Sequence, residues 1–222
     1  MQQIMLWRPG LTRPGCHALA ALFFLLVLCP AGVHGQRMPV EFMAGHKNYY
    51  YQHSVGMKLS GTSSFGFFHT SSILIPFDEE RGNEIMSQSY ITISINRALS
   101  AGFGTLFSPK NRIRPSVSLQ FLVQRPNTTV LIFPRADVWK QPSFELMGFW
   151  EQRSSGSKHL QFYGRLQVMT TWTFPEHNRS YQYLRVGAEH KGFGFGVAVN
   201  LDEYGKEARL YPNYGLFLRR VL

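Results

Sequence analysis

The stretch HLQFYGRLQVMTTWTF, from His159 to Phe174, places two kinds of side chain on alternate residues. One set is apolar or small: Leu160, Phe162, Gly164, Leu166, Val168, Thr170, Trp172 and Phe174. The residues between them are mostly polar: His159, Gln161, Tyr163, Arg165, Gln167, Thr171 and Thr173, with Met169 as the exception. Successive side chains of a β-strand point to opposite faces, so the pattern predicts one strand with an apolar and a polar face. Such a strand is long enough to cross a membrane, for which about 9–11 tilted residues suffice.

The same period of two recurs along the chain after residue 36, and no segment has the apolar spacing of a helix. The alternation predicts eleven strands, at 48–59, 63–77, 85–98, 101–108, 114–125, 128–136, 143–153, 158–174, 180–190, 193–202 and 208–222. A short twelfth is predicted at 38–44. No linker divides them, so residues 36–222 are expected to form one all-β domain in which consecutive strands pair as hairpins.

Connections between the predicted strands fall into two alternating sets. The short set is Ser60–Thr62, the turn near Ser100, Arg125–Asn127, Ser154–Ser157 and Lys191–Gly192. The longer set is Asp78–Glu84, Pro109–Ile113, Asp137–Pro142, Pro175–Arg179 and Glu203–Glu207. Tight turns at one end and longer loops at the other are typical of transmembrane β-barrels, which leave no backbone group unpaired in lipid.

Residues 1–35 read as a cleaved secretory signal peptide. Two arginines precede the apolar run ALAALFFLLVL, and Val33 and Gly35 supply small residues before a cleavage site. The mature chain would contain neither Cys16 nor Cys29. It would keep 21 Lys and Arg against 13 Asp and Glu, a net charge of +8. Anionic lipid or polysaccharide would suit that charge; no basic cluster of the nucleic-acid-binding type is present.

The signal peptide, the cysteine-free hairpin pattern and the terminal strand NYGLFLRRVL (213–222) resemble those of bacterial outer-membrane β-barrel proteins. The resemblance implies an up-and-down transmembrane barrel of about twelve strands (range 10–12), with a periplasmic C-terminus. It also implies contact with membrane lipids and lipopolysaccharide, help from the barrel-insertion machinery, and a monomer. Alternation alone equally fits a soluble, secreted ligand-binding barrel with its apolar face inside. The strand number favours the membrane, because a wide barrel is not filled by one thin apolar face.

Charged residues on the polar faces predict a cluster inside the barrel. A turn at 154–157 would place Glu145 opposite or nearly opposite Arg165, and the next turn would bring Glu189 to the same level. Arg185 and Glu151 are expected further along the wall. Paired charges of this kind either brace a filled lumen, because unpaired buried charge is costly, or form a constriction that selects solutes by charge.

A second candidate site is the pair His69 and Ser71, which share one strand face. A histidine beside a serine serves as base and nucleophile, and the H-x-S pair resembles those of outer-membrane phospholipase A and lipid A deacylases. The resemblance implies a third residue on the next strand, for which Asn83 or Glu84 is the candidate. His69 and Ser71 alternate in step with Phe65, Phe67, Ile73 and Ile75, so the pair is expected on the apolar face of its strand.

No cofactor is expected. The histidines are scattered without the spacing of metal ligands, and Phe193–Gly196 sits in an alternating strand instead of before a phosphate-binding helix. The favoured function is therefore an outer-membrane barrel with a structural or small-pore, passive-transport role. The alternatives are a lipid-modifying hydrolase that uses His69 and Ser71, and the soluble ligand-binding barrel.

Overall fold

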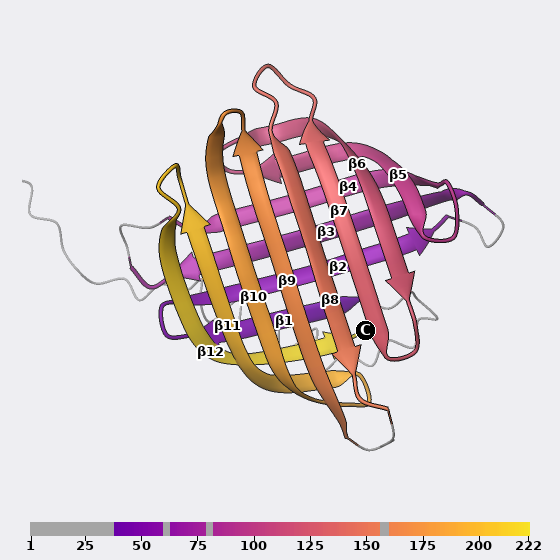
Figure 1. Cartoon of the computed structure of the whole chain (residues 1–222), viewed down its shortest axis with the longest axis vertical. Coiled ribbons are helices and arrows are strands. Elements are labelled where there is room, and N and C mark those ends of the chain that lie inside the picture. The colour runs from indigo at the N-terminus through magenta and orange to yellow at the C-terminus, as the bar shows by residue number, and fades with distance from the viewer. Residues whose placement is uncertain (1–37, 60–62, 79–81, 156–159) are drawn as a thin grey trace, which may run out of the picture. The chain divides into compact units, whose positions relative to one another are not determined.

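A computed structural model describes residues 38–59, 63–78, 82–155 and 160–222, which form one closed antiparallel barrel (Figure 1). Its twelve strands are β1 (Pro39–Gly45), β2 (Asn48–Lys58), β3 (Phe65–Pro76), β4 (Glu84–Ser94), β5 (Leu99–Ser108), β6 (Arg112–Gln124), β7 (Thr128–Asp137), β8 (Phe144–Arg153), β9 (Gln161–Thr173), β10 (Glu176–His190), β11 (Phe193–Tyr204) and β12 (Arg209–Val221). Each strand pairs with its neighbours in sequence, and β12 pairs with β1 to close the barrel. The predicted all-β, twelve-stranded, up-and-down fold is confirmed. The predicted signal peptide lies outside the described residues.

The predicted difference in length between the two sets of connections is wrong. Only Phe174 and Pro175 separate β9 from β10, because β10 begins at Glu176 and takes in most of the expected loop. The pairing of β10 with β9 skips Asn178: His177 lies opposite Trp172 and Arg179 lies opposite Thr171, as in a β-bulge. At the other end of the barrel, β8 and β9 are separated by residues 154–160, and β2 and β3 by residues 59–64. Connection length therefore does not distinguish the two ends.

The apolar stripe of the strands points outward and the polar stripe points inward. On β9, Leu166 and Val168 are each 43% exposed, whereas Gln167 between them is buried. The same outward face carries Phe65, Ile91, Ile93, Phe103, Leu119, Ile132, Trp150, Phe162, Phe195, Val197 and Leu216, all exposed. A soluble ligand-binding barrel would place these side chains at its centre. The arrangement contradicts that alternative.

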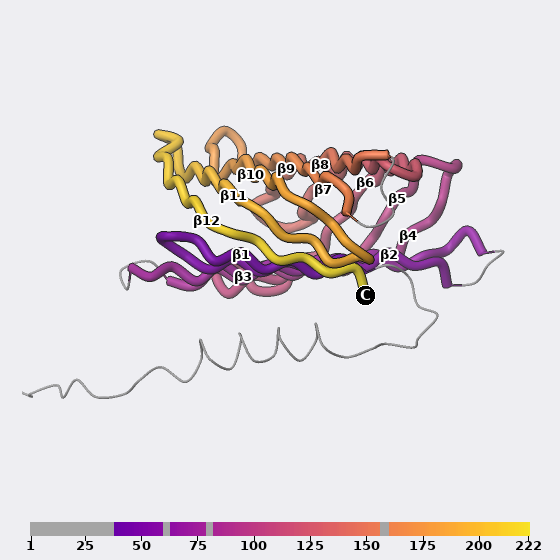
Figure 2. Tube along the Cα trace, turned by 90° about the horizontal axis from the view of Figure 1, so that it is seen from below, coloured from indigo at the N-terminus to yellow at the C-terminus, as the bar shows by residue number. Residues whose placement is uncertain are grey.

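Two cross-strand glycine pairs let the wall bend sharply. Gly187 of β10 lies opposite Gly196 of β11, and Gly45 of β1 lies opposite Gly215 of β12. A Cβ on Gly196 would lie 2.2 Å from the carbonyl oxygen of Val186 and 2.5 Å from Cα of Gly187. Figure 2 shows the wall as two broad layers, with β1–β3 in one, β7–β10 in the other, and β12 passing between them. The glycines thus permit the close backbone approach that such a bend requires.

Packed side chains fill much of the barrel. One buried cluster contains Met43, Tyr50, Leu74, Tyr163, Met169, Tyr181, Tyr183, Ala198 and Phe217. A second contains Phe68, Tyr90, Leu131 and Phe133. The hydroxyl groups of the tyrosines in these clusters have polar partners. Tyr90 and Ser116, for example, share a hydrogen bond of 2.8 Å. The described residues include no helix long and apolar enough to cross a membrane.

Candidate functional site: a charged vestibule inside the barrel

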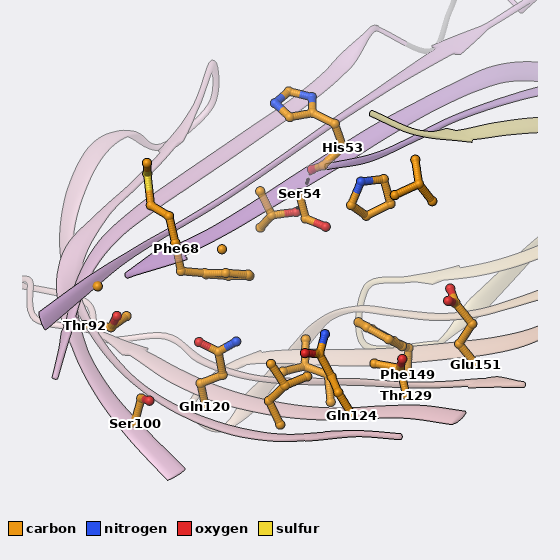
Figure 3. Close-up of a pocket in the computed structure, with 18 of the residues that line it drawn as sticks. His53, Ser54, Phe68, Thr92, Ser100, Gln120, Gln124, Thr129, Phe149 and Glu151 are labelled. Carbon is orange, nitrogen blue, oxygen red and sulfur yellow. Dashed lines mark hydrogen bonds between the residues drawn. The ribbon is translucent and has the colours of Figure 1, made fainter. Parts of the chain in front are cut away.

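A cavity of about 1080 Å³ occupies the half of the barrel in which β1 begins and β12 ends. Pro39, Val221 and Leu222 contribute to its lining, and Lys58 and Arg97 lie where strands end at its mouth. Figure 3 shows Gln120, Phe149 and Glu151 on one wall, facing Ser54 and Phe68 on the other. The lining is rich in amide, hydroxyl and charged groups. We call this cavity the vestibule.

Four charged side chains form a balanced cluster on the vestibule wall. Arg219 of β12 donates to Glu189 of β10 at 3.1 Å and to Glu151 of β8 at 3.2 Å. Arg153 of β8 donates to the same two acids, at 2.8 Å to Glu151 and 3.1 Å to Glu189. Tyr163 also donates to Glu151, at 2.9 Å. Two guanidinium groups and two carboxylates thus neutralise one another, which buried charge requires.

The vestibule floor holds two arginines and one carboxylate. Arg165 of β9 and Arg185 of β10 are directly opposed in register, and both reach across the lumen to Glu41 of β1. The Arg185 Nε to Glu41 distance is 2.8 Å, whereas Arg165 Nη1 approaches Glu41 only to 3.5 Å. Arg185 also donates to Asn200, at 2.8 Å. The floor therefore carries one more positive than negative charge.

A tyrosine-rich layer closes the lumen beyond this floor. We define this central layer as Tyr50, Leu74, Met169, Tyr181 and Tyr183. The rings of Tyr181 and Tyr183 stack 4.2 Å apart, and Tyr50 meets Tyr183 edge-on at 5.1 Å. The three tyrosines are 4%, 5% and 2% exposed, for Tyr50, Tyr181 and Tyr183 in turn. A water-filled passage would expose the side chains that line it, so the structure is closed at this level.

A smaller cavity, of about 190 Å³, lies on the far side of the central layer. It is lined by Gly82, Glu84, Tyr204 and Tyr211. Glu84 accepts hydrogen bonds of 2.7 Å from both Tyr204 and Arg179, and Arg179 also pairs with Asp202 at 2.6 Å. Charged groups therefore line the lumen on both sides of the central layer.

The five predicted lumen charges all face inward but do not form the predicted cluster. Glu145 lies opposite Thr171 instead of Arg165 and pairs with Arg135 of β7 at 3.0 Å. Glu151 is the residue opposite Arg165. The error is one of register: Arg153 lies opposite Tyr163, whereas the predicted turn at 154–157 would bring residue 158 opposite it. Glu189 likewise lies opposite Gln161.

Sequence reasoning missed further charged residues of the lumen, among them Glu41, Arg135, Arg153 and Arg219. Each shares the parity of the polar face of its strand, so alternation could have found them. Alternation could not predict which of these residues pair. Glu41 and Arg185, for example, are 144 residues apart in the sequence and meet across the lumen.

The His69 and Ser71 pair lies on the outward face, as its parity predicts. The two side chains share that face with Phe67 and Ile73, but Ser71 Oγ donates to the carbonyl oxygen of Met86 at 3.1 Å. His69 Nδ1 instead lies 2.9 Å from Oγ of Ser89, on β4. The serine partner of the histidine is thus Ser89 and not Ser71.

The predicted third residues do not join this pair. Asn83 precedes β4, whereas residues opposite His69 and Ser71 are Ser89 and Ser87. Glu84 points into the lumen, where it binds Arg179. The ring centre of His53 lies 5.2 Å from that of His69. Figure 3 shows the His53 side chain pointing away from the vestibule. Among the described residues, no group of three or more His, Cys, Asp or Glu could hold a metal ion.

Comparison with known proteins gives only distant likeness. No family model matches the chain, and no curated protein matches it. Among solved structures, a KdgM porin has a TM-score of 0.49 and 10% identity, covering 84% of this chain and 99% of its own. A NanC porin has a TM-score of 0.46 and 10% identity, covering 84% and 98%. LpxR from Salmonella typhimurium has a TM-score of 0.41 and 8% identity, covering 84% and 100%.

Proposed function

We propose that this chain spans the bacterial outer membrane as a barrel. The support is the outward face, where large apolar side chains encircle a wall whose backbone groups are paired in a closed ladder. An apolar outer face and a fully paired backbone are both favoured in hydrocarbon. In water, an exposed apolar face is unfavourable. In this proposal membrane lipids and lipopolysaccharide surround a monomer, and the barrel-insertion machinery places it after the signal peptide is removed.

Within that barrel we propose passive transport of small polar solutes through the lumen. The observation that carries this function is the presence of two cavities in opposite halves of the lumen, with the central layer lying between them. A barrel with a purely structural role needs no vestibule of about 1080 Å³. Because the layer is closed, passage requires Tyr50, Tyr181 and Tyr183 to move, and the layer acts as the gate.

Single-channel recording in planar bilayers tests the gate. The purified wild-type barrel is expected to show small, infrequent current steps. Tyr181→Ala removes a ring of the central layer and is expected to give larger or longer openings. Tyr214→Ala is the matched control, since Tyr214 is an outward, exposed tyrosine on β12. If the wild type and Tyr181→Ala are both silent while folded, the barrel is structural and the transport proposal is wrong.

A second candidate, ester hydrolysis at the outer face, is favoured by the 2.9 Å contact between His69 and Ser89. With Nδ1 unprotonated, His69 would take the hydroxyl proton as Ser89 Oγ attacks the carbonyl carbon of a lipid ester. His69 would then protonate the departing alcohol, and water would release the acyl group. The pair faces the side on which acyl chains would lie.

Release of fatty acid from phospholipid and from lipid A tests this candidate. Ser89→Ala is expected to abolish release, and Ser71→Ala, on the same face of β3, is expected to leave it intact. Release that depends on Ser71 and not on Ser89 would contradict the assignment. No release by the folded wild type would exclude the hydrolase.

A further inference from the structure

The vestibule carries an excess of basic side chains. Five line it, Lys58, Arg97, Arg153, Arg165 and Arg219, against the three acids Glu41, Glu151 and Glu189. The balanced cluster of Arg153, Arg219, Glu151 and Glu189 cancels four of these charges. What is left is Arg165 at the floor, which shares Glu41 with Arg185, and the two cations near the mouth.

The surroundings of Arg165 hold its guanidinium in place and neutralise it only in part, through Glu41 at 3.5 Å. Its carbon Cζ lies 4.8 Å from the centre of the Phe149 ring, over one face. Its Nη2 donates to the amide oxygen of Gln167. Gln52, in the amide orientation that satisfies both of its polar atoms, accepts from Arg165 Nη1 at 2.8 Å. These neutral oxygens fix the direction of the group but leave its charge.

Glu41 is a poor counter-ion for Arg165. The Glu41 carboxylate lies 2.8 Å from Arg185 and 3.5 Å from Arg165. It therefore compensates the charge of Arg185 more strongly than that of Arg165. Arg165 and the two amides that hold it, Gln52 and Gln167, all line the vestibule. A guanidinium fixed on a cavity floor with a surplus of charge is suited to binding a carboxylate or phosphate.

We propose that the vestibule floor at Arg165 binds the anionic group of a small solute, either carboxylate or phosphate. Lys58 and Arg97 attract such solutes to the mouth, and the amides around Arg165 orient the bound group. If the barrel transports solutes as proposed above, small anions are the class it accepts. The binding site itself requires only the closed structure.

Isothermal titration calorimetry on the full, detergent-solubilised barrel tests the site. Inorganic phosphate and acetate are the probes, and glucose is the neutral control. We expect phosphate or acetate to bind and glucose not to bind. Arg165→Gln is expected to weaken binding roughly 10- to 100-fold, the range that follows from losing one hydrogen-bonded charge. Arg209→Gln removes the same charge from β12 near the opposite end of the barrel and is expected to leave binding unchanged.

A second variant tests the role of Glu41 in the opposite direction. Glu41→Gln removes the competing charge while keeping an acceptor, so it is expected to tighten phosphate or acetate binding. Heat-modifiable migration on gels shows which variants are folded. Absence of anion binding by the folded wild type, or equal binding by folded Arg165→Gln, would overturn the proposal. Anion binding by a barrel that never conducts would leave this site standing and refute transport alone.

Discussion

Replacement of Arg219 by methionine is the sharpest test of the charged lumen. Arg219 is buried and makes contacts of 3.1 Å to Glu189 and 3.2 Å to Glu151. Removing one partner of a buried ion pair usually costs about 3–5 kcal/mol, because the other charge is left uncompensated. Here Arg153 still bonds both acids, so we expect a loss near the lower limit, about 3 kcal/mol.

The measurement is equilibrium unfolding of the barrel in detergent or vesicles, followed by tryptophan fluorescence in urea. A double-mutant cycle with Glu151→Gln provides the control, because that change removes one of the stranded carboxylates. We expect the double variant to lose less than the sum of the two single variants, with a coupling above about 1 kcal/mol. A loss below about 1 kcal/mol for Arg219→Met, or additive losses in the cycle, would refute the assigned contacts.

Two further predictions concern the wall of the barrel. Leu166→Arg places a charge at the middle of the outward stripe of β9 and is expected to lower the free energy of unfolding in vesicles by about 2–4 kcal/mol. Leu210→Arg, near the end of β12, should lower it by at most about 1 kcal/mol. Equal effects of the two variants in refolding titrations would argue against a membrane-spanning belt. Gly196→Ala introduces a Cβ 2.2 Å from the Val186 carbonyl oxygen and is expected to destabilise by about 1–3 kcal/mol, while Gly82→Ala meets nothing within 4 Å. A wild-type unfolding midpoint for Gly196→Ala would show that the bend does not need glycine.

The fold and the direction of each side chain followed from local alternation. On a strand, parity alone assigns a residue to one face, so Leu166 and Arg165 could be separated without any knowledge of their partners. Strand boundaries were accessible only in part, because turn signals mark where a strand can end but β10 begins at Glu176, inside an expected loop. The predicted strand 85–98 failed only at its end, where the side-chain oxygen of Asn96 accepts from the backbone of Ala98 and Leu99 and closes the turn.

The partners of the lumen charges were decided by tertiary structure. Register depends on how two strands align across their connection. Arg153 of β8 lies opposite Tyr163 of β9, further along β9 than the Ser-Gly signal indicates, and this moves Glu145 away from Arg165. Contacts across the lumen, such as Glu41 with Arg185, depend further on how the closed wall bends. The same limit applied at the outer face, where alternation placed His69 and Ser71 together but strand pairing gave His69 a serine from β4. The sequence by itself determined which side chains face inward, because that depends on neighbouring residues; which of them meet depends on closure and register, properties of the whole barrel.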